Sequence, residues 1–344
     1  MHSIAVAGHL CLDIVPRLGE SAELIPGQLI DVGPLSITPG GSVANTGGAL
    51  ASLGAKVTPF ATIGDDELGE LLLAKLDAQG FASPRVAVSG RMSTSYSLVF
   101  EKPGVDRTFW HHTGANEEFD GSSVELHGHE MLHVGYPPLL PGVVTDGGRP
   151  LHTLFARARS AGIATSLDLA VVDRTSAVGA LDWNAILASA FSECDIASPS
   201  LDDLTSALHI DEPYSPALVD RLADRMLADG VAVVAISAGH HGLRVRTASA
   251  DRLRAGGTVL SPLADTWADR DITLPALRVE HPVTTNGAGD ASTAGLLFAI
   301  SRGATPEQAA ALAAASSAVT ISGARPTPDA IATVDPSLAR LFES

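Results

Sequence analysis

The sequence predicts an α/β protein whose doubly wound, mostly parallel sheet is flanked by helices and accompanied by a small β-sheet lid. Three times an apolar, helix-like segment ends in glycine and is followed by a β-branched run, as in ALASLG then AKVTPFATIG. Residues 231–236 are continuously apolar, as expected for a strand that helices cover on both faces. Regular alternation of helices and strands is typical of a parallel sheet.

Glycines mark the predicted ends of these helices. Gly54, Gly162 and Gly230 stand where each helix-like segment stops. Glycine has no Cβ and adopts a positive φ without a clash, so it commonly ends a helix. We expect a strand to begin shortly after each one.

Two segments interrupt the alternation and predict the lid. Residues 13–40 are rich in proline and glycine, and residues 94–112 read as a hairpin that turns at 102–104. Neither resembles a core helix or a buried parallel strand. Together they predict a separate small sheet over one edge of the main domain, where such flaps commonly serve as lids.

The rest of the chain completes one expected domain, 1–344. Residues 249–282 mix polar turns with a single strand-like run at 272–279. Near the carboxyl end, Thr305 is suited to cap a helix and Pro306 to occupy its first position.

Charge and cysteine usage exclude several classes of function. The chain carries 22 Lys and Arg against 39 Asp and Glu, a net charge of −17, which repels nucleic acid and anionic lipid. Cys11 and Cys194 lie far apart and predict free thiols in a reducing compartment. No apolar run reaches about 18 residues and no basic leader begins the chain, so we expect a cytoplasmic protein.

The strongest chemical motif is the segment 284–300, TTNGAGDASTAGLLFAI. Gly287, Ala288 and Gly289 are small enough to let an anion approach the amides at the start of the apolar helix that follows. Asp290 then lies in the first helical turn, within reach of a hydroxyl held beside the anion. The same residues could equally form a plain glycine-rich turn with an acidic helix start.

Two other motifs resemble catalytic signatures, but the residues around them are incompatible with the helix that each signature requires. Residues 129–133 spell H-E-x-x-H, a zinc-protease signature that requires a helix, but glycine and proline on both sides favour a strand. Residues 235–239 approximate a serine-hydrolase elbow, which also requires a helix, yet a strand-like run follows.

The sequence resembles a known family. The G-A-G-D motif and the segment 39–69, PGGSVANTGGALASLGAKVTPFATIGDDELG, are similar to the two signature regions of the PfkB, or ribokinase-like, carbohydrate kinases. The resemblance is nearly full length, and it also includes Gly8, Asp13 and the segments 107–116, 235–243 and 322–328. It implies an ATP-dependent, Mg²⁺-requiring kinase that phosphorylates a hydroxyl group, expected to be a hydroxymethyl group, of a sugar or sugar-like substrate.

The resemblance also implies roles for individual residues. Asp290 corresponds to the catalytic base, and the backbone of Gly287–Gly289 to the anion hole. Asp13, the pair Gly40 and Gly41, and Asn45 correspond to the sugar ligands, which suits a polyol because carboxylate and amide groups bind hydroxyls. Read alone, Asp13 could be a solvated loop acid and Asn45 a helix cap.

The nucleotide site maps onto two further segments. Ser237, Gly239 and Gly242 correspond to a family loop that meets the phosphates of ATP. Ser200 and Asp203 correspond to an N-x-x-E motif that organises water around Mg²⁺, so no direct protein ligand to the metal is implied. Serine and aspartate preserve the polarity of that motif with a shorter reach.

Two departures from the family pattern limit what can be carried over. Thr284 replaces an acid that helps to build a monovalent-cation site in many relatives, which puts potassium activation in doubt. Tyr136 falls about where ribose kinases carry an acidic sugar ligand, which disfavours ribose. A nucleoside kinase and a catalytically silent, sugar-binding regulator are the alternatives to a sugar kinase.

The lid carries two further expectations. In the predicted strand, alternation places Phe109 and His111 on one face, and Thr108, Trp110 and His112 on the other. One of these faces is expected to cover the substrate, and the alternation does not say which. Relatives often pair through their lids, so the resemblance implies a homodimer.

Overall fold

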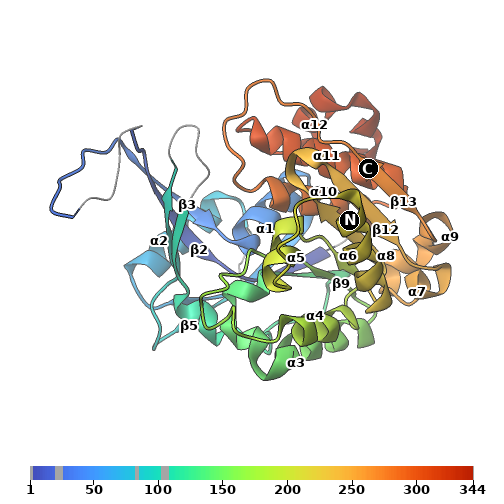
Figure 1. Cartoon of the computed structure of the whole chain (residues 1–344), viewed down its shortest axis with the longest axis horizontal. Helices are drawn as coiled ribbons and strands as arrows, with labels where there is room; N and C mark the ends of the chain where they lie inside the picture. Colours follow the sequence, from blue (N-terminus) through green and yellow to red (C-terminus); the bar gives the residue numbers. More distant parts are fainter. Residues whose placement is uncertain (1–2, 20–25, 82–84, 102–107, 344) are drawn as a thin grey trace.

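A nine-stranded, mostly parallel sheet forms the centre of the chain in the computed structural model, which describes residues 3–19, 26–81, 85–101 and 108–343 (Figure 1). The strand order is β13-β12-β11-β10-β9-β8-β1-β4-β5, and only β12 runs antiparallel to its neighbours. The strands are β1 (Ser3–Gly8), β4 (Lys56–Gly64), β5 (Arg85–Ser89), β8 (Met131–Gly135), β9 (Ala164–Leu167), β10 (Ile196–Ala197), β11 (Val233–Ser237), β12 (Leu243–Thr247) and β13 (Asp271–Leu274).

Helices cover both faces of this sheet, so its central strands are buried and mostly apolar. In β1, Ile4 and Val6 belong to one buried core, while Ala5 and Ala7 belong to a second core on the opposite face. On the first face lie α1 (Ser42–Ser52), α2 (Glu67–Ala78), α7 (Ala250–Arg254), α8 (Gly257–Leu260), α9 (Ala264–Trp267), α10 (Ala288–Ser301), α11 (Pro306–Ile321) and α12 (Pro328–Val334). On the second lie α3 (Pro141–Ser160), α4 (Trp183–Phe191), α5 (Leu201–Ala207) and α6 (Pro216–Ala228). The predicted doubly wound fold is confirmed.

The predicted helix ends are also confirmed. Gly54, Gly162 and Gly230 follow α1, α3 and α6 with φ of 99°, 75° and 117°. Thr305 accepts a hydrogen bond from the backbone of Gln308 and caps α11, with Pro306 at the first helical position.

The lid is a separate four-stranded sheet in the order β3-β2-β6-β7. Its strands are β2 (Cys11–Pro16), β3 (Leu35–Gly40), β6 (Tyr96–Phe100) and β7 (Thr108–His112), and they project from one side of the main body (Figure 1). The small sheet predicted from 13–40 and 94–112 is therefore present. The predicted turn at 102–104 lies outside the described residues.

The segment 249–282 differs from its prediction. It contains three short helices, α7, α8 and α9, and the strand predicted at 272–279 ends at Leu274 because Pro275 follows and cannot donate to the ladder. Trp267 ends α9, is fully buried, and donates its indole N–H to the carbonyl oxygen of Ala304 at 2.9 Å.

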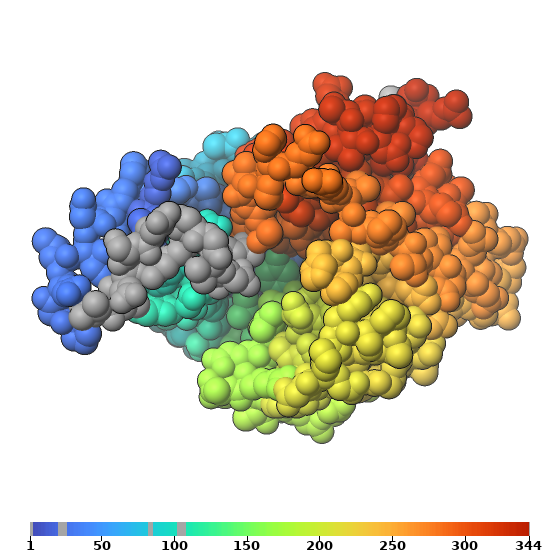
Figure 2. Space-filling model, turned by 45° about the horizontal axis from the view of Figure 1, so that its top comes forward, coloured from blue at the N-terminus to red at the C-terminus, as the bar shows by residue number. Residues whose placement is uncertain are grey.

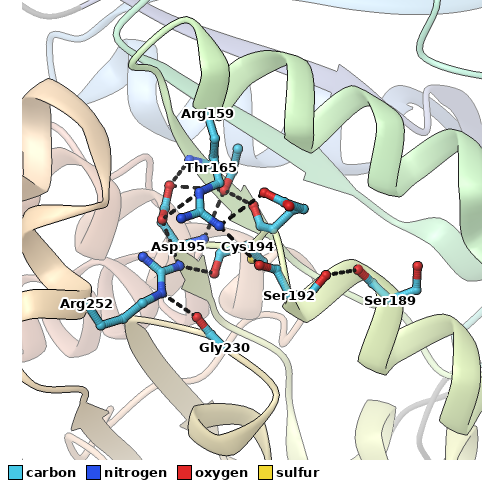
Figure 3. Close-up of polar contacts among 9 residues, drawn as sticks. Arg159, Thr165, Ser189, Ser192, Cys194, Asp195, Gly230 and Arg252 are labelled. Carbon is cyan, nitrogen blue, oxygen red and sulfur yellow. Dashed lines mark hydrogen bonds and ion pairs between the residues drawn. The ribbon is translucent and has the colours of Figure 1, made fainter.

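At the amino ends of the central strands, a buried carboxylate joins several elements (Figure 3). Asp195 directly precedes β10 and is completely buried. Its carboxylate accepts a hydrogen bond from the backbone N–H of Thr165 at 2.9 Å and pairs with Arg252 of α7, also at 2.9 Å. Arg252 donates in addition to the carbonyl oxygen of Gly230, so one side chain links α7 to the starts of β10 and β11.

Candidate active site

The glycine-rich turn at 287–289 begins helix α10. Gly287 is the N-cap residue, with a left-handed φ of 73° that favours glycine. The first amides of a helix have no acceptor within the helix, so they can bind an anion. A Cβ placed on Gly289 would meet no atom within 4 Å, which shows that the backbone here adjoins open space.

The carboxylate of Asp290 lies in the first turn of α10 and is only 7% exposed. The Thr46 hydroxyl donates to its Oδ1 at 2.7 Å, and the Tyr136 phenol donates to the same oxygen. Asn45 supplies another side-chain hydrogen bond. Three donors from two distant chain segments therefore fix the orientation of this carboxylate.

Burial and hydrogen bonding shift the pKa of the Asp290 carboxyl in opposite directions. Burial raises the pKa of Asp290 above its usual value, and the donors Tyr136, Thr46 and Asn45 lower it in part. The net shift of the pKa is upward, which makes the carboxylate a stronger base than an exposed aspartate.

Two further buried carboxylates lie at the carboxyl ends of the strands. Asp168, 5% exposed, directly follows β9 and accepts hydrogen bonds from Thr293 at 3.3 Å and from the Leu169 backbone at 2.8 Å. Burial, with Asp203 and Asp290 nearby, raises the pKa of Asp168 well above its usual value. Burial likewise raises the pKa of Asp203 to about 6.

This concentration of negative charge suits a divalent cation. Mg²⁺ commonly binds through one or two carboxylates and completes its shell with water and phosphate oxygens. Asp168 and Asp203 could supply such groups, directly or through water. Within the described part of the chain, no three His, Cys, Asp or Glu side chains are grouped closely enough to hold a metal ion by themselves.

The residues predicted for the nucleotide lie on adjoining loops. Ser200 forms an isolated bridge with Ser237, the last residue of β11. Ser200 and Asp203 cap α5 reciprocally, since each side chain accepts a hydrogen bond from the other backbone N–H, at 3.0 and 2.8 Å. The carboxylate of Asp203 is thus partly committed to the helix start.

One pocket brings the nucleotide loop and the glycine-rich turn together. Its lining includes Ser237 and Gly289, together with Ser198, Ser292 and Thr293. The hydroxyl-bearing side chains and the backbone of Gly289 therefore border one small space.

The glycines of the nucleotide loop have positive φ. Gly239 has a φ of 53° and Gly242 a φ of 98°. A Cβ on Gly242 would collide with the carbonyl oxygen of Leu274, so this position requires glycine.

The predicted sugar ligands lie where the lid meets the main body. Asp13 in β2 is only 6% exposed, and a Cβ on Gly40 would collide with its carboxylate. Gly41 is the N-cap of α1, where a Cβ would collide with His9, and Asn45 lies inside that helix. Asp13 is therefore not a solvated loop acid, and Asn45 is not a helix cap.

The two excluded motifs have the expected structures. His133 is a buried residue of β8, hydrogen-bonded to Ser42 at 3.2 Å and Ser166 at 2.9 Å, and burial lowers its pKa to about 3. Ser237 is followed by a short 3₁₀ helix (Gly239–His241) and then β12, not by the helix of a hydrolase elbow.

Sequence reasoning missed the roles of several side chains of this site. Thr46 lies within the segment 39–69, which resembles a family signature, but that resemblance implies no role for it. Asp168 and Tyr136 each directly follow a buried strand, β9 and β8. The resemblance relates the position of Tyr136 to a sugar ligand but does not link it to Asp290. Ligands of parallel sheets bind beyond the carboxyl ends of the strands, so a search of the residue after each strand could have found Asp168.

The nine-stranded sheet, the separate lid and the helix that starts at a glycine-rich turn define the ribokinase-like class of α/β proteins. Residues 1–330 match the model of the pfkB family of carbohydrate kinases. The chain belongs to this family. No curated protein matched it.

Solved structures share the fold at low sequence identity. A ribokinase from Arabidopsis thaliana, complexed with ribose and ATP, is 18% identical, with a TM-score of 0.72 over 100% of this chain and 99% of its own. A ribokinase from Thermotoga maritima is 17% identical, with a TM-score of 0.70 over 97% and 99%. A nucleoside kinase from Burkholderia thailandensis, in complex with inosine, is 18% identical, with a TM-score of 0.70 over 97% and 98%.

Of the helices that the structure describes, none is both long enough and apolar enough to span a membrane.

Proposed function

We propose that the protein transfers the terminal phosphoryl group of ATP to a hydroxyl group, expected to be a hydroxymethyl group, of a sugar or nucleoside. The observation that carries this proposal is the buried carboxylate of Asp290 in the first turn of α10, beside the amides of Gly287–Gly289. Family membership supports a kinase, and the solved relatives with ribose and ATP or with inosine support these two acceptor classes.

In the proposed reaction, the acceptor binds against Asp13 and Asn45, and closure of the lid excludes water. Asp290 takes the proton of the acceptor hydroxyl as that oxygen attacks the phosphorus in line. The amides at 287–289 stabilise the charge on the transferring group. Asp168 and Asp203 would hold Mg²⁺, directly or through water, and the ion would supply neutralising charge on the phosphates.

Substitution of the proposed base tests this mechanism. We expect Asp290→Asn to lower kcat at least ~100-fold, the usual loss when a general base is removed. Acceptor binding, measured by calorimetry, should remain near that of the parent protein. The assay is ADP release over a panel of sugars and nucleosides.

Asp329→Asn is the matched control. Asp329 is also an aspartate in a first helical turn, that of α12, but it is exposed and lies outside the site. Near-normal turnover by Asp290→Asn would refute the assignment of the base. Tight acceptor binding without turnover by the parent protein would instead favour the silent regulator.

A further inference from the structure

A pair of histidines lies between the lid and the proposed base. His9 follows β1 and is only 2% exposed. Its ring centroid lies 5.1 Å from that of His111 on lid strand β7, and 5.8 Å from that of Tyr136, which donates to Asp290. A continuous row of rings therefore leads from the lid to the proposed base.

The imidazole nitrogens of this pair are buried with unused hydrogen-bonding capacity. Both nitrogens of His9 and Nε2 of His111 have no hydrogen-bond partner among the described residues. The other nitrogen of His111, Nδ1, lies 3.1 Å from the hydroxyl of Ser97. Burying a polar atom without a partner is unfavourable, so these atoms point to a bound ligand.

The chemistry of the pair suits hydroxyl groups. A neutral imidazole offers one N–H donor and one nitrogen acceptor, and a hydroxyl can both accept from the first and donate to the second. Burial and the neighbouring His111 lower the pKa of His9 well below its usual value, and burial lowers the pKa of His111 to about 4. Both rings are therefore uncharged at neutral pH.

The charges beside the pair are negative. The carboxylates that raise the pKa of Tyr136, in addition to its burial, belong to Asp290, Asp168 and Asp203. An anionic group brought to His9 without a cation of its own would meet repulsion from these carboxylates, and neutral imidazoles would not offset it.

We infer that His9 and His111 are specificity-determining residues, which bind hydroxyl groups of an uncharged polyol and select against sugar phosphates and sugar acids. The inference rests on the proposed function, because the acceptor must lie beside Asp290. It also decides which face of β7 covers the substrate. His111 turns toward the site, and alternation places Phe109 on the same face.

Competition between charged and uncharged acceptors tests the selectivity. We expect ADP release with neutral sugars or nucleosides to exceed that with the corresponding sugar phosphates or sugar acids by at least ~10-fold in kcat/KM. A preference for the anionic member of any pair would overturn the inference while leaving the kinase intact. Absence of turnover with every compound would count against the proposed function instead. Calorimetric binding of the same pairs, which needs no turnover, then decides the selectivity.

Substitution of the lid histidine tests the residue itself. We expect His111→Ala to raise KM about 10-fold, with kcat within ~3-fold of the parent, because the interaction is made equally in the ground and transition states. His111→Gln, which keeps a donor and an acceptor, should recover part of the loss.

His112→Ala is the matched control on the next residue of the same strand. His112 is exposed and contacts Ser93 and Tyr96 of the lid rather than His9. Its KM should stay within ~2-fold of the parent value. Equal effects of the two alanine variants, or an unchanged KM in His111→Ala, would overturn the role given to His111.

Discussion

The orientation and the pKa of the Asp290 carboxylate depend on side chains that are remote from it in sequence. Thr46 comes from α1 and Tyr136 follows β8, yet both donate to the same carboxylate oxygen. Burial raises the pKa of this group while the donors lower it, so the base strength is a balance between the two. Removal of one donor should therefore raise the pKa of Asp290 further.

The Tyr136→Phe substitution tests this balance. The proposed base works only when it is ionised, so activity falls as the pH drops through the pKa of Asp290. Loss of the phenol donor raises that pKa, and the acid limb of the kcat/KM profile should therefore move to higher pH. Tyr214→Phe, on a ring stacked against His241, should leave the limb in place. Coincident profiles for Tyr136→Phe and the parent would contradict the role of the phenol.

At the residue scale, the sequence predicts the groups that belong to short patterns and misses those that meet only in the fold. Asp290 and the glycines before it form one contiguous motif, and this motif by itself predicts an anion hole beside a carboxylate. Thr46, Tyr136 and Asp168 lie in three separate segments, and their convergence depends on strand order. Neither composition nor periodicity encodes that order directly.

At the scale of the elements, a buried ion-pair cluster links the amino ends of the central strands to neighbouring helices. Asp195 is completely buried between Arg252 of α7 and the backbone at the start of β9 (Figure 3). Arg159 of α3 approaches the same carboxylate at 3.8 Å. This cluster lies at the end of the sheet opposite to the proposed catalytic residues, so its role is expected to be structural.

The Arg252→Met substitution tests that structural role. It leaves a buried carboxylate with a weaker partner, and loss of one member of a buried pair typically costs about 3 kcal/mol or more of unfolding free energy. Arg254→Met on the same helix removes only exposed pairs with Asp251 and Asp265, each worth less than about 1 kcal/mol. Urea unfolding measures both variants, and similar midpoints would show that the cluster adds little stability.

Long helices could be predicted from the sequence, whereas very short ones could not. Helices such as α1, α3 and α6 are long enough to show a periodic apolar pattern, and a glycine marks the end of each. The short helices of 250–267 span only one turn or a little more, which is too short for a period to be detected. The strand predicted at 272–279 is too long, because it continues past Pro275, which cannot donate to the ladder.

At the scale of the molecule, the lid is set apart from the main body. Figure 2 shows the blue part of the chain, which includes β2 and β3, at one end of the molecule. Trp110 of edge strand β7 is half exposed, at 50%, on the face opposite to His111.

The homodimer implied by the family resemblance can be tested at this surface. We expect light scattering to give about twice the mass of one chain, and Trp110→Lys to reduce it toward the mass of one chain, because a buried charge opposes association. His127→Lys should not change the mass, because the exposed His127 lies beside the amino ends of β1 and β4 and not in a lid strand. A parent protein with the mass of one chain would contradict the predicted dimer.

A single residue, Gly41, separates lid strand β3 from helix α1. The strand ends against the carboxylate of Asp13, and the helix carries the threonine that orients Asp290. We therefore expect a tilt of the lid to alter, through this joint, the contact between Thr46 and Asp290. If the lid closes only on a bound acceptor, the proposed base reaches its working position only then, and hydrolysis of ATP should be slow while no acceptor is bound.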